Sequence, residues 1–344
     1  MKLEIGNFYV RDIVFGDRLS YQDGVLTIQK EEALEFIKQD DRITEAELYI
    51  VKPGDKVRLC PVKEAIEPRV RPDGRSAFPG YTGDLAPAGS GVTHALKNCS
   101  VLVVGRHWGG FQDGLIDMSG EGQKYTLFGQ FNNLVLVADT NEEFEKREQQ
   151  KKNDALRRAG HRLAEYVAGC VKELVPEETE VFELGGMIKR DAETEKLPSV
   201  VYVMQPQSQM EEMGYNDLVY GWDMNHVVPT VMHPNEILDG AMVSGSFMPV
   251  FSKWSTYDFQ NCPNIKALYR EHGKTINFLG VIMSNLNVAL EQKERSAQFV
   301  AQIANSLGGD GAVVAEEGYG NPDADFVADI VTLENSGVKT VGVT

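Results

Sequence analysis

The strongest constraint on the fold is an alternation, after residue 197, of apolar strand-like runs with amphipathic helical segments. The runs are rich in Val, Ile and other buried-strand residues: "SVVYVMQ" (199–205), "VVPTVMH" (227–233), "TINFLGVIM" (275–283), "GAVVAEE" (311–317) and "KTVGVT" (339–344). Helical patterns such as 264–273 and 288–309 lie between them and end at glycine. Because strands that alternate with helices form parallel sheets, the sequence predicts an α/β chain with a mostly parallel sheet over 197–344.

In such sheets, ligands bind beyond the carboxyl ends of the strands, where loops and helix N-termini gather. Two segments lie at predicted ends of this kind, "MSNLN" (283–287) and "EEGYGNPD" (316–323). We expect both segments to line one shared crevice that holds the substrate. The side chains predicted to face it are Asn285, Glu316, Glu317, Asn321 and Asp323.

The first part of the chain has a different composition. Residues 1–140 hold short β-branched runs separated by Asp-Gly, Pro-Gly and Gly-rich turns, which indicates a β-rich N-terminal domain. Residues 141–196 begin with helix formers and continue into a polar connecting segment, in which "EVFELGG" (180–186) is compatible with a strand. The last run ends at Thr344 without a covering element. We therefore expect either a C-terminally truncated chain or a partner that completes the domain.

The charge balance limits the partners of the chain. Its 34 Lys and Arg residues against 51 Asp and Glu give a net charge of −17, which would repel nucleic acid and anionic membranes. The start, "MKLEIGNFYV", lacks the pattern of a signal peptide, and no apolar stretch is long enough to cross a bilayer. Four scattered cysteines without a CxxC pair argue against disulfides and structural zinc. These features predict a cytoplasmic protein.

One short stretch holds the metal-ligand candidates. "HVVPTVMHPNE" brings together His226, His233 and Glu236, which could contribute to a metal site. No other histidine lies nearby in the sequence, so a structural role for these residues is the alternative. The glycine-rich "GRHWGGFQDG" (105–114) lacks the order of a phosphate-binding loop and is typical of a turn, and no GxSxG nucleophile motif is present.

Longer motifs run through the whole chain. They are "MKLEIGNFYVRDIVFGD" (1–17), "PVKEAIEPRVRPDG" (61–74), "FPGYTG" (78–83), "GFQDGLIDMSGEG" (110–122), "DGAMVSG" (239–245), "LYREHGKTINFLGVIMSNLNV" (268–288), "KERS" (293–296) and "DGAVVAEEGYGNPDAD" (310–325). In this order they resemble the proprotein subunit of component B of the glycine, sarcosine and betaine reductases. The resemblance implies a subunit of an oxidoreductase complex.

What the resemblance further implies is a reductive deamination. In the family, an amine substrate condenses with a pyruvoyl carbonyl on this subunit, and a selenocysteine on a partner subunit displaces the amine. This sequence contains no selenocysteine, so a selenoprotein or thiol reductase partner would be a separate chain, and we expect an oligomeric complex. The residues expected to carry the chemistry are Asp239, Ser244, Ser246 and Glu317.

The sequence departs from the family at the pyruvoyl site. The family forms this group at an Asn-Cys that follows Ser-Gly, whereas Ser244 and Gly245 are here followed by Ser246 and Phe247. Phenylalanine cannot become a pyruvoyl group, so we expect an uncleaved chain without that cofactor. Cleavage before Ser246, one position earlier than in the family, is the alternative.

Three functions are compatible with these observations. The first, our main hypothesis, is a component B subunit that binds a substrate such as betaine, whose quaternary nitrogen cannot form a neutral imine. Trp222, Trp254 and Tyr257 could hold this nitrogen by cation–π contact, although core packing is the alternative for each ring. The second is a non-catalytic relative that scaffolds a partner subunit. The third is a metal-assisted enzyme built on His226, His233 and Glu236.

Overall fold

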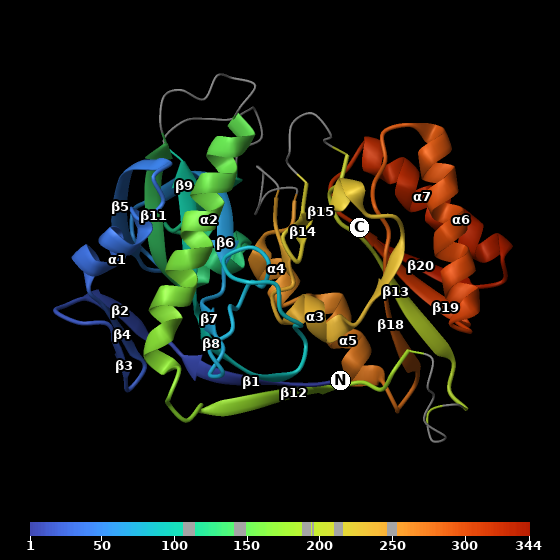
Figure 1. Ribbon diagram of the computed structural model, residues 1–344, viewed down its shortest axis with the longest axis horizontal. Helices are drawn as coiled ribbons and strands as arrows, with labels where there is room; N and C mark the ends of the chain where they lie inside the picture. Colours follow the sequence, from blue (N-terminus) through green and yellow to red (C-terminus); the bar gives the residue numbers. More distant parts are fainter. Residues whose placement is uncertain (106–113, 141–148, 188–193, 195, 210–215, 246–252) are drawn as a thin grey trace.

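The computed structural model describes residues 1–344 apart from 106–113, 141–148, 188–193, 195, 210–215 and 246–252 (Figure 1). The expected mixed α/β class is confirmed, because helices and several sheets make up the described residues. Ser246 and most of the glycine-rich segment 105–114 lie outside the described residues. The predictions about them therefore stay untested.

A five-stranded sheet forms the centre of the C-terminal half. Its strand order is β16-β18-β13-β19-β20, in which β16 is antiparallel and the other four strands are parallel. The strands are β13 (Ser199–Gln205), β16 (Thr230–Met232), β18 (Asn277–Met283), β19 (Gly311–Glu316) and β20 (Lys339–Val343). The carboxyl ends of the parallel strands therefore lie at the same edge of the sheet.

Helices cover both faces of this sheet (Figure 1). In β13, Val201 and Val203 share a core with α6 and α7, whereas Tyr202 and Met204 share a second core with α3, α4 and α5. The helices are α3 (Pro234–Leu238), α4 (Thr256–Gln260), α5 (Pro263–Glu271), α6 (Leu290–Ser306) and α7 (Asn321–Asn335). Every residue of β18 is buried and none is charged, because both faces of the sheet are covered.

The expectation of a buried strand over 227–233 is wrong in part. Only Thr230–Met232 forms a strand, and it is the antiparallel edge strand β16. Val228 and Val231 are exposed, because one side of an edge strand and the loop before it face solvent. Pro229, which has no N–H to donate, suits this position.

A second five-stranded sheet forms the core of the N-terminal half. Its order is β10-β6-β9-β11-β5, and helix α2 packs on β6, β9 and β11. The elements are β5 (Ile43–Val51), β6 (Arg58–Ile66), β9 (Cys99–Gly105), β10 (Gly114–Asp117), β11 (Asn132–Thr140), α1 (Lys30–Ile37) and α2 (Gln149–Ala168). The pairs are antiparallel except β9 with β11.

A four-stranded sheet connects the two halves. Its order is β12-β1-β8-β7, with β1 (Lys2–Tyr9), β7 (Arg69–Val70), β8 (Gly91–Lys97) and β12 (Glu178–Glu183). Leu3 and Ile5 of β1 belong to the core that lies against the C-terminal sheet, whereas Phe8 belongs to the N-terminal core. Strand β12 contains the first four residues of "EVFELGG" (180–186), and it pairs antiparallel with β1 (Figure 1).

Two small sheets complete the described structure. One is β2 (Asp12–Phe15), β4 (Val25–Ile28) and β3 (Ser20–Gln22), and the other is β15 (Trp222–Asp223), β14 (Leu218–Val219) and β17 (Met242–Val243). Short 3-10 helices occur at Gly122–Tyr125, Leu127–Gln130, Gly169–Val171 and Met224–His226. Within the described part of the chain, no helix has the length and apolar character needed to cross a membrane.

Candidate functional site

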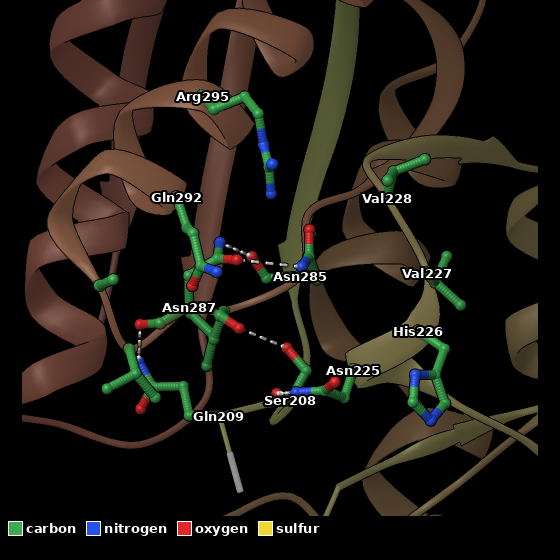
Figure 2. A pocket seen from close by; sticks show the side chains of 13 residues that line it. Ser208, Gln209, Asn225, His226, Val227, Val228, Asn285, Asn287, Gln292 and Arg295 are labelled. Atoms are coloured by element: carbon green, nitrogen blue, oxygen red, sulfur yellow. Dashed lines mark hydrogen bonds between the residues drawn. The ribbon is translucent and has the colours of Figure 1, made fainter. Parts of the chain in front are cut away.

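A pocket of about 360 Å³ lies at the carboxyl ends of β13 and β18 (Figure 2). Its polar lining comes mostly from amide side chains, and the predicted residue Asn285 is one of them. The full polar lining is Ser208, Gln209, Asn225, His226, Asn285, Asn287, Gln292 and Arg295. Part of the predicted segment 283–287 therefore lines a pocket at the strand ends, but no residue of 316–323 is among the lining residues. Arg295, Asn225 and Ser208 line the pocket although no sequence pattern pointed to them.

Hydrogen bonds tie the walls of this pocket together. The Ser208 hydroxyl group donates to the backbone oxygen of Leu286 (2.9 Å), and Asn225 Nδ2 donates to the backbone oxygen of Ser208 (2.9 Å). These bonds connect the loop after β13 to the loop after β18 and to the 3-10 helix at Met224–His226. The pocket is thus held by contacts between segments distant in the sequence.

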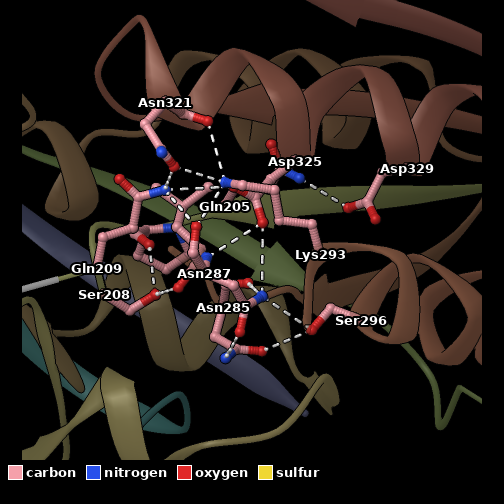
Figure 3. Close-up of polar contacts among 12 residues, drawn as sticks. Gln205, Ser208, Gln209, Asn285, Asn287, Lys293, Ser296, Asn321, Asp325 and Asp329 are labelled. Carbon is pink, nitrogen blue, oxygen red and sulfur yellow. Dashed lines mark hydrogen bonds and ion pairs between the residues drawn. The ribbon is translucent and has the colours of Figure 1, made fainter. Parts of the chain in front are cut away.

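A buried lysine organises the polar side chains beside the pocket (Figure 3). Lys293 is 4% exposed and pairs with Asp325, and its Nζ donates to Asn321 Oδ1 (2.7 Å). The Asn287 N–H donates to Asp325 Oδ1 (3.1 Å), and Gln209 Nε2 donates to Asn321 Oδ1 (2.8 Å). Asn321, predicted to bind substrate, therefore also holds the loops in place.

Lys293 was missed in the sequence analysis although a local signal was present. It precedes Ala297 and Val300 by four and seven residues on α6, and all three residues are buried. A lysine on the apolar stripe of a helix is expected to have a buried partner. The partner, Asp325, lies on α7, and the pattern could not identify it.

A pair of buried carboxyl groups lies at the end of β19. Asp217 is 0% and Glu317 is 1% exposed, and the Gln207 N–H donates to both, at 2.9 and 3.1 Å. Burial raises the pKa of Asp217 well above its usual range, and Glu317 raises it further through charge and a hydrogen bond. Burial and the neighbouring Glu317 thus both favour the protonated form of Asp217.

This acid pair also binds the backbone on both sides of residues 246–252. The Gly245 N–H donates to Asp217 Oδ1 (2.9 Å), and the Trp254 N–H donates to Glu317 Oε1 (3.0 Å). The sequence identified Glu317 but not Asp217, which carries no motif signal. Whether Glu317 is catalytic stays a prediction.

Ser244 lies at a second buried network, between the two halves of the molecule. Its backbone N–H donates to Thr256 Oγ1 (3.0 Å), which lies 3.1 Å from Glu64 Oε2 and 3.0 Å from His161 Nε2. Burial raises the pKa of Glu64 to about 8 and lowers the pKa of His161 to about 3. Both groups are therefore uncharged at neutral pH.

We expect Glu64→Gln to flatten the pH dependence of stability. Folded wild-type protein keeps a proton on Glu64 that the unfolded chain releases near pH 4.5, so stability falls as pH rises from about 4.5 to about 8. The amide of glutamine imitates the protonated carboxyl group but does not titrate. The variant should therefore lose a slope of at most about 1.4 kcal/mol per pH unit in the free energy of unfolding. Denaturant unfolding at several pH values measures this slope, with Glu173→Gln at an exposed position as control. Equal slopes in the wild type and Glu64→Gln would contradict this prediction.

Asp239, predicted to be catalytic, lies in a buried ion pair instead of in the pocket of Figure 2. Arg71 Nη2 donates to Asp239 Oδ2 at 2.7 Å, and both side chains are 1% exposed. The Gly89 N–H and the Thr93 hydroxyl group also donate to this carboxyl group, at 2.7 and 2.6 Å. Burial raises the pKa of Asp239, and Arg71 opposes this effect. These contacts join the C-terminal half to the segments around β7 and β8.

The three predicted aromatic residues contact different rings. Trp222 is 62% exposed, with its ring 6.4 Å from that of His226. Tyr257 packs against Phe128 in the N-terminal core, at a ring distance of 5.2 Å. Trp254 contacts Phe259. The three rings therefore have different neighbours, and their role as substrate contacts stays a prediction.

Two of the predicted acidic residues lie at the start of α7 and the strand before it. Burial raises the pKa of Glu316 to about 7, and Asp323 and Asp325 raise it in the same direction. Asp323 is exposed. Glu316 can thus accept or release a proton near neutral pH, which is suitable for acid–base chemistry.

Two of the three residues of the metal hypothesis, His233 and Glu236, have structural roles. His233 caps α3, where its Nδ1 accepts from the Asn235 N–H (3.2 Å), and Glu236 Oε2 accepts from the His233 N–H (2.9 Å). This reciprocal capping explains the His-x2-Glu spacing. His226 is exposed and lines the pocket of Figure 2. Among the described residues, no group of three or more His, Cys, Asp or Glu side chains is placed to hold a metal ion.

Comparison with known proteins gives relatives over the full length of the chain. A family model of glycine/sarcosine/betaine reductase component B subunits matches residues 1–344. The chain is 70% identical to the betaine reductase complex component B subunit alpha of Peptoclostridium acidaminophilum, and the match covers 100% of the chain and 78% of the relative. No solved structure matches the chain.

Two further relatives come from the same organism. The chain is 40% identical to the glycine reductase complex component B subunits alpha and beta, over 99% of the chain and 78% of the relative. It is 39% identical to the sarcosine reductase complex component B subunit alpha, over 100% of the chain and 79% of the relative.

Proposed function

The chain belongs to the glycine/sarcosine/betaine reductase component B family, and from this we propose that it binds betaine for reductive deamination in a complex with a selenoprotein or thiol-bearing partner. The observation that carries this proposal is the difference in identity between the relatives. Identity is 70% to the betaine reductase subunit but only 40% and 39% to the glycine and sarcosine reductase subunits.

We also propose that the subunit works without a pyruvoyl group. The residues present do not fit this group, because Phe247 stands where the resemblance requires the precursor cysteine. The proposal is supported by the names of the relatives, since the glycine relative is named as subunits alpha and beta, whereas the betaine and sarcosine relatives are named as subunit alpha. Betaine suits a site without a reactive carbonyl, because its quaternary nitrogen cannot form an imine.

The pocket at the strand ends supports a small-molecule substrate. Its volume of about 360 Å³ lies within the range of ligand sites, and its amide side chains offer both donors and acceptors. Lys293 and Asp325 hold the neighbouring loops, so the polar groups keep their positions before a ligand arrives. The partner subunit would supply the reducing thiol or selenol, and this chain would bind and orient the substrate.

Purified full-length protein is expected to stay uncleaved and to bind betaine more tightly than sarcosine or glycine. Intact mass spectrometry measures the first property, and titration calorimetry with the three ligands measures the second. Two fragments with a break before Ser246 would show that the pyruvoyl route is retained. Absence of binding to all three ligands, in the isolated chain and in the assembled complex, would favour the scaffolding function instead.

A further inference from the structure

The pocket of Figure 2 differs in charge from the chain as a whole. None of the thirteen described residues that line it is an Asp or Glu, although the net charge of the chain is −17. The permanently charged side chain among these lining residues is that of Arg295. A cavity lined by one guanidinium and several amides favours an anionic group.

Arg295 lies where it can reach a ligand in the pocket. It belongs to the second turn of α6, and its side chain extends into the cavity toward Asn285 (Figure 2). The residue before α6, Ala289, also lines the pocket and cannot cap the helix with its side chain. The partial positive charge of the helix start therefore adds to the charge of Arg295.

Apolar side chains form the remaining wall. Val227 and Val228 lie across the pocket from Gln292 (Figure 2), and Leu286 and Val288 extend the apolar lining. Contact with the methyl groups of a ligand would cover apolar surface on these side chains, of which Val228 and Val288 are 64% and 60% exposed.

We propose that this pocket takes a small amino-acid derivative with a methylated nitrogen and that Arg295 binds its carboxylate. The carboxylate lies against the guanidinium and the start of α6, and the methyl groups face the valines. This inference rests on the proposed function and names the substrate class of the same site. The acid pair of Asp217 and Glu317 does not take the ammonium group, because both side chains are buried and bonded to backbone N–H groups.

The test is calorimetric titration of the full-length chain with three ligands. Betaine has both groups, tert-butylacetate keeps the carboxylate but has a neutral carbon in place of nitrogen, and choline keeps the quaternary nitrogen but lacks the carboxylate. We expect binding of the first two and much weaker binding of choline. Arg295→Gln should lower the affinity for betaine and for tert-butylacetate about 10-fold or more, because it removes a charge-assisted hydrogen bond to their carboxylates.

Two control variants make the result specific. Arg270→Gln removes the same charge from an exposed position on α5 and should keep wild-type affinity. Arg295→Lys keeps the positive charge but lacks the planar guanidinium that can donate two parallel hydrogen bonds. Its affinity for the carboxylate ligands should lie between those of the wild type and Arg295→Gln. Thermal unfolding of each variant checks that the fold is unchanged.

The outcomes separate this inference from the proposed function. Wild-type affinity of Arg295→Gln for betaine, or equal binding of choline and betaine, would overturn the carboxylate role of Arg295 and leave the proposed function standing. Arg295-dependent binding of tert-butylacetate without any binding of betaine would support the carboxylate role and contradict the proposed function.

Discussion

Replacing Asp239 by alanine is expected to lower the free energy of unfolding by about 3–5 kcal/mol. The variant would leave the Arg71 guanidinium, whose side chain is 1% exposed, without its carboxylate partner at 2.7 Å. It would also leave the donors of Gly89 and Thr93 without this acceptor. Because water cannot replace these buried contacts, the free energy lost at the two donors adds to that lost with the ion pair. Denaturant unfolding at pH 7, followed by circular dichroism, measures the change.

Two variants control for the charge and shape changes. Asp41→Ala removes the same charge from an exposed residue and should change stability by at most about 0.5 kcal/mol. Asp239→Asn keeps the shape and one acceptor oxygen, so its loss should be smaller than that of Asp239→Ala. If Asp239→Ala and Asp41→Ala were equally stable, the buried ion pair would not contribute to stability as its geometry indicates.

Replacing Gly245 by alanine is expected to destabilise the protein by more than about 3 kcal/mol and to abolish betaine binding. A Cβ atom at this position would lie 1.4 Å from the backbone oxygen of Asn216 and 2.3 Å from its carbonyl carbon. Because both atoms belong to the backbone, one of the two chain segments must move. The movement would break the hydrogen bond from the Gly245 N–H to Asp217 Oδ1 (2.9 Å) and disturb the acid pair, which accepts from the N–H of Gln207, the residue before the lining residue Ser208. Denaturant unfolding and calorimetric titration with betaine measure the two effects.

Gly169 offers the matched control for this substitution. A Cβ there would meet no atom within 4 Å, so Gly169→Ala should leave stability unchanged or raise it slightly. Betaine binding should also be unchanged. A Gly245→Ala protein that unfolds and binds like Gly169→Ala would show that the chain relaxes at this contact without cost.

The sequence located the strands of the C-terminal sheet because a strand covered on both faces must be apolar along its whole length. The runs at 199–205 and 311–317 correspond to β13 and β19 within one residue. The run at 227–233 misled us, because valines also occur at exposed edges and around pockets. Apolar composition alone does not distinguish these environments.

The candidate site could be predicted only where it depends on strand ends. Asn285 lines the pocket because the carboxyl end of a parallel strand lies beside those of its neighbours. Glu317 was located by the same argument, but its partner Asp217 was not, because the loop that carries Asp217 reaches the site from another part of the fold. Asp239 opens the motif "DGAMVSG", yet its partners show that it holds the two halves together.

By itself, the sequence determined the mixed α/β class and the family, because these depend on local patterns of burial and on long ordered motifs. The tertiary structure alone decided the pairs that hold the molecule together. Arg71 and Asp239 are 168 residues apart, and Thr256 and Glu64 are 192 residues apart. A local pattern can show that a buried charge needs a partner, but the identity of that partner depends on which segments the packing of the cores brings into contact.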